Sequence, residues 1–155
     1  MIRAILTYPD PFLERKSAPV SSVDNGIRRL IDDMFETMYA ANGVGLAAPQ
    51  VGVGQRVIVV DVSPVEKELA PFALVNPEIV DRVGRVEDSE GCLSVPGVEG
   101  LVVRAEEIEV TGLNESGDPV RFRARNFLAR AIQHEVDHLD GVLFISRLSA
   151  AARQA

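Results

Sequence analysis

The sequence predicts an α+β fold in which antiparallel or mixed β-sheets pack around a central helix that carries the motif H-E-x-x-H. One observation is the predicted order of elements: a helix, several strands and a second helix, without the regular strand–helix alternation of a parallel α/β sheet. The other is composition, because 155 residues with 46% hydrophobic and 25% charged residues are typical of one globular domain. We therefore expect a single catalytic domain over residues 1–155.

The first half of the chain is predicted to contain an irregular arm, one helix and one buried strand. Residues 1–20 contain three prolines and should form the arm. Apolar residues at helical spacing, preceded by capping residues, predict an amphipathic helix over 24–41. A loop with four glycines follows over 42–54. The β-branched run R56-V-I-V-V-D-V62 then predicts a buried strand.

The second half is predicted to consist of strands followed by a helix. Residues 73–80 and 83–86 resemble shorter strands or edges, interrupted by Pro77 and Gly84. Further strands are expected near 101–104, 108–113 and 120–125. A loop rich in turn residues separates the last two of these strands and indicates a hairpin.

The final helix is predicted over Phe127–Leu139, which contains neither proline nor glycine. Asn126 is the expected N-cap, and Gly141 is the expected C-terminal stop. One apolar stripe should face the core and consists of Leu128, Ile132, Val136 and Leu139. A second stripe consists of Phe127, Ala131, His134 and His138. The face that carries the histidines thus continues as an apolar surface, which indicates a pocket for an apolar side chain.

Composition excludes several functional classes. A net charge of −7 and a pI near 4.8 argue against nucleic acid or an anionic membrane as the main partner. The sequence contains no apolar stretch of membrane-spanning length, and its opening residues lack a secretory apolar core. One cysteine cannot form an intrachain disulfide, which suits a cytoplasmic location.

A metal site is predicted from the only two histidines, His134 and His138, which stand four residues apart with Glu135 between them. A helix places residues i and i+4 on one face, where both can bind one cation. Cys92, the only cysteine, is the candidate third ligand, and three protein ligands leave a fourth position open, as in catalytic centres. An acidic residue could still close the site, although Asp137 lies at a different angle on the helix. The alternative is a pair of solvated histidines on a surface helix.

The glycine-rich loop G43-V-G-L-A-A48 fits a dinucleotide-binding pattern, but its context is wrong. It follows a helix instead of a strand, and Pro49 interrupts any helix that would begin inside it. Its glycines can instead let the backbone approach a ligand. Gln50 carries an amide that can donate to a developing oxyanion, although a plain turn with a solvated Gln50 is the alternative.

Three segments together resemble the motifs of bacterial peptide deformylase: G43-V-G-L-A-A-P-Q50, E90-G-C-L-S94 and Q133-H-E-V-D-H-L-D-G141. The opening Y8-P-D-P-F-L13 and the order of elements are also similar, so the resemblance covers nearly the whole chain. It implies that Cys92, His134 and His138 bind one divalent metal ion per chain. In that family the native ion is Fe²⁺, and zinc, nickel or cobalt can replace it.

The resemblance also implies a reaction on N-formylmethionyl nascent peptides, with release of formate. Glu135 would take a proton from water activated by the metal and pass it to the leaving amine. The side chain of Gln50 and the backbone N–H of Leu93 would donate to the oxyanion. The substrate-binding residues implied by the family are Val44, Gly45 and Gly91 along the peptide backbone, and Phe127, Arg130 and Ala131 around the methionine. In view of the acidic net charge we expect no membrane partner and no nucleic-acid specificity, and the sequence leaves a transient contact with the ribosome open.

The chain departs from the family pattern at a few positions. Glu99 stands where some members carry Arg, and Asp88 stands where others carry a larger apolar residue. The residues from Ser149 onward are too few for the long C-terminal helix of some members. The resemblance also implies an ion pair between Glu90 and Arg104. Two other functions compete with deformylation: a general metallopeptidase, and a domain whose metal is purely structural.

Overall fold

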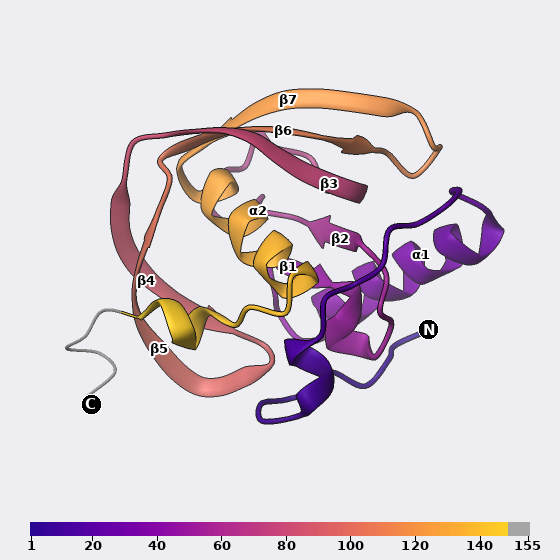
Figure 1. Cartoon of the computed structure of the whole chain (residues 1–155), viewed down its shortest axis with the longest axis horizontal. Coiled ribbons are helices and arrows are strands. Elements are labelled where there is room, and N and C mark those ends of the chain that lie inside the picture. Colours follow the sequence, from indigo (N-terminus) through magenta and orange to yellow (C-terminus); the bar gives the residue numbers. More distant parts are fainter. Residues whose placement is uncertain (149–155) are drawn as a thin grey trace.

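A five-stranded antiparallel sheet and a separate two-stranded hairpin surround the second helix in the computed structural model, which describes residues 1–148 (Figure 1). The helices are α1 (Asn25–Ala40) and α2 (Asn126–Leu139). The strands are β1 (Gly45–Ala47), β2 (Val57–Val60), β3 (Phe72–Val83), β4 (Val86–Cys92), β5 (Val95–Arg104), β6 (Glu107–Leu113) and β7 (Pro119–Arg125). The sheet has the order β1-β2-β3-β6-β7, and β4 pairs only with β5. The predicted α+β class is confirmed.

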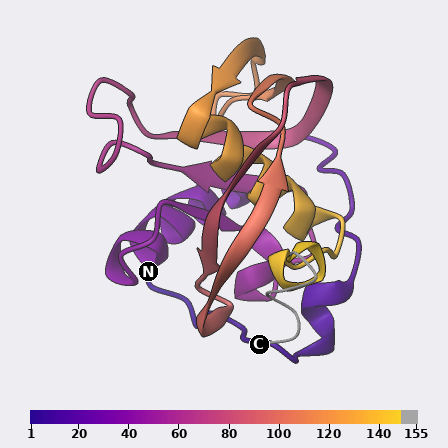
Figure 2. The same cartoon turned by 90° about the vertical axis from the view of Figure 1, so that its left-hand side faces the viewer.

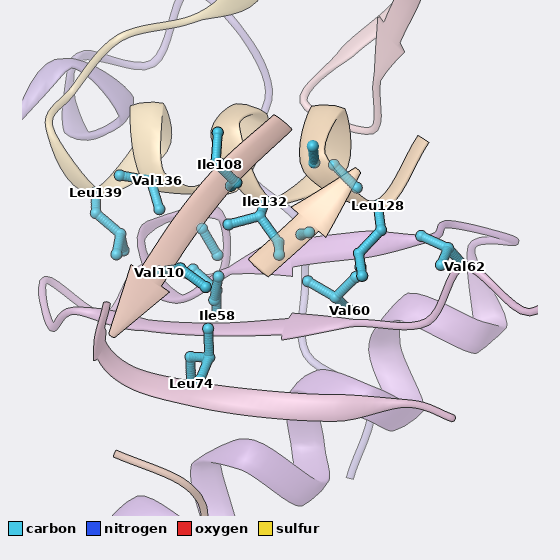
Figure 3. Close-up of a cluster of buried hydrophobic side chains, with 14 residues drawn as sticks. Ile58, Val60, Val62, Leu74, Ile108, Val110, Leu128, Ile132, Val136 and Leu139 are labelled. Atoms are coloured by element: carbon cyan, nitrogen blue, oxygen red, sulfur yellow. The ribbon is translucent and has the colours of Figure 1, made fainter. Parts of the chain in front are cut away.

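The strand β2 is apolar at every position because it lies between the two helices. Ile58 and Val60 belong to the cluster that packs against α2, whereas Val57 and Val59 belong to the cluster that packs against α1. Figure 3 shows the α2 side of this arrangement, with Ile132 directed at the sheet. A strand buried on both faces lacks the polar–apolar alternation of a half-exposed strand, as the continuous run of the sequence predicted.

The first helix forms almost where its sequence pattern predicted it. Asp24 is the N-cap, and its carboxylate accepts a hydrogen bond from the N–H of Ile27 at 2.9 Å. The buried side chains of α1 include Met34 and Met38, which are fully enclosed. They fill the space against β1 and β2 on the face opposite α2.

The second helix differs from the prediction at its start and agrees with it at its end. The N-cap position belongs to Arg125, which makes no side-chain capping bond, so the prediction of Asn126 as the cap was wrong. Asn126 instead takes a left-handed φ of 56°, a conformation that asparagine tolerates, and donates its N–H to the carbonyl of Glu106 at 3.1 Å. Gly141 has a φ of 76° and follows the helix as the expected stop.

The segment between β2 and β6 holds the largest departures from prediction. The predicted break at Pro77 does not occur, because β3 continues through it with a register shift between Val75 and Glu78. The expected single strand over 83–86 is instead divided by a turn: Val83 ends β3, Val86 begins β4, and Gly84 between them has a φ of 75°. The strand β4 and the first half of β5 were not predicted. Figure 2 shows that this hairpin crosses in front of α2.

The N-terminal arm links parts of the molecule that are distant in sequence. The N–H of Leu6 donates to the carbonyl of Gln50, and the N–H of Tyr8 donates to the carbonyl of Ser94, both at 2.7 Å. Short 3₁₀ turns occupy Pro11–Glu14, Ala48–Val51 and Phe144–Arg147. No helix within residues 1–148 is long and apolar enough to cross a bilayer. The expected absence of a long C-terminal helix concerns positions outside the described residues.

Candidate metal centre and catalytic pocket

The structure brings the three predicted metal ligands together from two elements. The helix α2 places His134 and His138 side by side, with ring centroids 5.0 Å apart. Cys92 ends β4, and its Sγ lies 3.3 Å from Nε2 of His138. One ligand atom from each of the three residues lies within 4.8 Å of the other two. No other group of three His, Cys, Asp or Glu side chains within residues 1–148 meets this distance. One thiolate and two imidazoles suit a divalent transition metal, and no second cysteine exists to close the site.

Glu90 fixes the orientation of one histidine. Its Oε1 lies 2.9 Å from Nδ1 of His134, so Nε2 is the nitrogen left to face the ligand cluster. Burial alone would lower the pKa of His134, but the contacts with Cys92 and Glu90 outweigh it and raise the pKa to about 10. The contact with Glu90 occupies Nδ1, so Nε2 is the atom that would bind a metal ion in exchange for its proton.

Glu90 itself belongs to a buried network of charges. Arg104 donates to both carboxylate oxygens of Glu90, at 2.8 and 2.9 Å, which confirms the expected ion pair. Arg104 also binds Asp137 at 2.5 Å, and Asp137 in turn binds Arg147. Asp137 thus lies outside the ligand group. Burial alone would raise the pKa of Glu90, but hydrogen bonds from Arg104 and His134 hold it well below its usual range.

Arg130 joins the ligand-bearing hairpin to the ligand-bearing helix. Its guanidinium binds Glu90 at 2.6 Å and the carbonyls of Val102 and Val86 at 3.0 and 2.7 Å. The side chain is 8% exposed, and Arg130 lies one helical turn before His134. From the sequence, Arg130 was predicted only to contact the methionine of the substrate with its apolar stem. An arginine on an otherwise apolar helix face, close to the histidines, was the signal for a buried charged partner.

Glu135 is buried beside the ligand cluster without a hydrogen-bond partner at Oε1. Its pKa is raised to about 7, chiefly by burial. A buried carboxyl group that titrates near neutrality suits a group that accepts and later releases a proton.

The two glycines of the G-V-G sequence make room for residues of the other two motifs. A Cβ at Gly45 would lie 2.5 Å from Oε2 of Glu135, and a Cβ at Gly43 would lie 2.7 Å from Cδ1 of Leu93. A side chain at either position would therefore force Glu135 or Leu93 to move from its place in the site. The two glycines let the backbone before and within β1 pass close to both side chains without displacing them.

Gln50 is held by three contacts and is only 2% exposed. Its Oε1 accepts from the N–H of Ala47 at 2.9 Å, while Nε2 donates to Oγ of Ser94 at 3.0 Å and lies 3.7 Å from Sγ of Cys92. The amide nitrogen is thereby turned toward the cysteine. The alternative of a solvated glutamine is wrong. Ser94 ends the motif E90-G-C-L-S94, but the sequence predicted no role for it.

A pocket of about 570 Å³ opens beside this cluster. Its wall includes Gln50, Cys92, Leu93, His134 and Glu135, together with the six expected substrate-binding residues, Val44, Gly45, Gly91, Phe127, Arg130 and Ala131. His138 lies behind the wall and is 1% exposed. Glu99 lines the pocket, whereas Asp88 does not. On either side of the pocket, β1 and β4 each have a strand partner on one edge only among the described residues.

The comparisons with known proteins agree with this geometry. Residues 2–154 match the family model described as polypeptide deformylase. The chain is 49% identical over 153 residues to peptide deformylase of Acidobacterium capsulatum, covering 99% of the chain and 90% of that relative. The crystal structure of a peptide deformylase from Legionella pneumophila has a TM-score of 0.92 at 46% identity, covering 99% and 90% of the two chains. The enzyme from Ehrlichia chaffeensis, solved in complex with actinonin, has a TM-score of 0.93 at 45% identity, covering 99% and 92%.

Proposed function

The chain belongs to the peptide deformylase family, and from this premise we propose how its own residues carry out the reaction. The enzyme is a metal-dependent hydrolase that removes the formyl group from the N-terminal methionine of newly made proteins. The observation that carries the proposal is a buried carboxyl oxygen of Glu135, without a hydrogen-bond partner, next to a group of three metal ligands that has no fourth protein ligand, both within residues 1–148.

Cys92, His134 and His138 would hold the metal ion, with Glu90 orienting His134. When bound, the ion supplies Lewis-acid chemistry, because it lowers the pKa of water and polarises the formyl carbonyl. We propose Fe²⁺ as the native ion, with zinc, nickel or cobalt as replacements. One thiolate with two imidazoles is compatible with all four metals.

Glu135 is the proposed general base and acid. Its pKa of about 7 allows it to accept a proton from the attacking water at neutral pH. It then gives this proton to the amine that leaves, so that formate and a free amino terminus are the products. Gln50 and the backbone N–H of Leu93 are proposed to donate to the oxyanion. Each such donor typically contributes about 3 kcal/mol to the transition state.

The peptide is proposed to bind as an added strand between β1 and β4, with its main chain against Gly45 and Gly91. The carbonyl of Val44 already accepts from the N–H of Asp61 at 2.8 Å, on the side of β2. Because successive residues of a strand direct their backbone groups to opposite edges, those of Gly45 face the open edge. Val44 then lines the pocket, while its carbonyl stays bound to Asp61 and not to the peptide.

The methionine side chain is proposed to enter the apolar end of the pocket. Phe127 and Ala131 line it from α2, and the stem of Arg130 completes this wall while its guanidinium stays bound to Glu90. An apolar slot beside the metal would favour methionine over polar first residues.

We propose that residues 1–155 act as one catalytic domain, because β1, β4 and α2 all contribute to one pocket. Its substrates are nascent chains, so we place it in the cytoplasm and propose a transient contact with the ribosome. Co-sedimentation with ribosomes that carry a formylated nascent chain, compared with empty ribosomes, tests this contact.

The function is tested with iron-loaded protein prepared without oxygen. Formyl-Met-Ala-Ser should release formate, whereas acetyl-Met-Ala-Ser and the unblocked peptide should not react. Internal cleavage of any peptide would instead indicate a general metallopeptidase. Glu135→Gln should retain its metal and lose at least about 100-fold in turnover. Glu115→Gln, in the exposed β6–β7 loop, is the matched control and should keep full activity.

A further inference from the structure

Glu99 differs from every other charged side chain that lines the pocket. Glu90 and Arg130 are buried and paired with each other, and His134 and Glu135 are buried within the candidate catalytic group. Glu99 is exposed, and among residues 1–148 no side chain forms an ion pair or hydrogen bond with its carboxylate. The pocket therefore presents one uncompensated negative charge to whatever enters it.

The register of the hairpin fixes the face on which Glu99 lies. Glu99 is paired with Gly91 across the two strands, and a Cβ at Gly91 would lie 3.4 Å from Cγ of Glu99. Cross-strand partners share a face of the sheet, and neighbouring residues lie on opposite faces. Since Glu90 points toward α2, where it binds Arg130 and His134, Gly91 and Glu99 lie on the opposite face.

A peptide added as a strand beside Gly91 would obey the same alternation. Its methionine side chain points into the pocket, toward the wall formed by α2. The side chain of the next residue must therefore point to the opposite face, which carries Glu99. We propose that Glu99 makes this enzyme prefer substrates with lysine or arginine directly after the formylmethionine. The proposal rests on the proposed function and deepens it by naming a substrate class.

The size of the preference follows from the exposure of Glu99. Ion pairs between exposed groups are weak, so we expect kcat/KM to be about two- to five-fold higher with lysine than with alanine at this position. Glutamate should give a value lower than alanine by a similar factor. Both differences should shrink at high salt, because the Debye length falls from about 10 Å at 0.1 M to about 3 Å at 1 M.

The experiment measures kcat/KM for formyl-Met-Ala-Ser, formyl-Met-Lys-Ser and formyl-Met-Glu-Ser on the metal-loaded enzyme. Glu99→Gln should make the three values equal within error, and Glu99→Arg should reverse their order. Glu87→Gln is the matched control, because Glu87 is exposed on the same face of β4 but does not line the pocket. It stands four residues from Gly91, about 13 Å along the strand, so the preference should persist.

The outcomes separate this proposal from the proposed function. Equal turnover of all three peptides by the unaltered enzyme would overturn the role of Glu99 and leave deformylation standing. A lysine preference that survives in Glu99→Gln would also overturn it. Failure to release formate from formyl-Met-Ala-Ser would contradict the proposed function itself.

Discussion

Two networks of arginines and carboxylates in this molecule differ in burial. The network around the metal ligands, here called the inner network, consists of Glu90, Arg104, Arg130 and Asp137. The network on the outer face of β3, β6 and β7, here called the outer ladder, consists of Asp81, Glu107, Glu109, Arg121, Arg123 and Arg125. Side chains in the inner network are at most 14% exposed, whereas the three arginines of the ladder are 39–73% exposed.

The difference shows what burial adds to the same pair of functional groups. Exposed pairs exchange their partners with water and ions, so they fix little geometry. A buried carboxylate must keep all its donors, because each missing donor leaves a charge without compensation. Glu90 thereby holds β4 and α2 in one relative position, and this position places Cys92 beside His138.

The largest expected effect comes from removing the shared carboxylate. Glu90→Gln leaves Arg104 and Arg130 buried without their common partner, so the free energy of unfolding should fall by about 3–5 kcal/mol. Metal affinity should fall about 10- to 100-fold, because His134 loses its orienting group. Urea titration and competition with a chelator measure the two quantities. A loss below 1 kcal/mol would mean that the inner network behaves like an exposed one.

Removal of the clamp between hairpin and helix should have a smaller effect. Arg130→Met keeps the apolar stem but loses the bonds to Glu90, Val86 and Val102, while Arg104 still compensates Glu90. We expect the free energy of unfolding to fall by about 2–3 kcal/mol. Cobalt absorption spectra should show weaker metal binding. Unchanged cobalt affinity would contradict the role of Arg130 in aligning the two ligand-bearing elements.

Acid should act on the inner network through Glu90. Its pKa lies below the ordinary value of 4.5 in the folded protein, so its stabilising contribution is complete above pH 4.5 and is lost as the pH falls toward the folded pKa. One such group changes the free energy of unfolding by at most about 1.4 kcal/mol per pH unit. Urea titrations between pH 5 and pH 3, with chelator present throughout, should give a shallower slope for Glu90→Gln. Equal slopes would assign the acid sensitivity to other groups.

The outer ladder should give the smallest effect. Arg123→Gln removes ion pairs with Asp81, Glu107 and Glu109 at once. Because Arg123 and Asp81 are exposed and Glu107 and Glu109 are only half-buried, we expect a loss below about 1 kcal/mol, most of which 1 M salt should abolish. The value of kcat/KM should not change. A loss as large as that of Arg130→Met would remove the distinction between the two networks.

The elements that sequence reasoning predicted are those whose stability comes from apolar patterns. The helix α1 and the buried strand β2 carry such patterns, and the β6–β7 hairpin adds a turn-rich loop. The strand β4 has no such pattern, because its residues Val86–Ser89 are exposed and its buried residue is Glu90. Its stability depends on Arg104 and Arg130, which stand 14 and 40 residues away in the sequence.

The same limit applies to the candidate site. The metal ligands were predictable, because the helical spacing of His134 and His138 and the single Cys92 are visible in the chain. The close packing of Gly45 against Glu135 was not predictable, because the spacing of residues in the sequence does not show which backbone segment lies next to a buried carboxylate. Ser94 and the clamp at Arg130 likewise become visible only once the hairpin is placed on α2.

The open edges of β1 and β4 bear on aggregation. Unpaired strand edges invite pairing with the edges of other copies, and such pairing is a common route to insoluble protein. Here β1 is only three residues long and buried, so a flat strand from another folded copy has no approach to it. The strand β4 carries the exposed carboxylates of Glu87 and Asp88, and like charges repel a second β4. In the proposed binding mode, these open edges accept one extended peptide, whereas the short β1 and the carboxylates of β4 oppose pairing with a second copy.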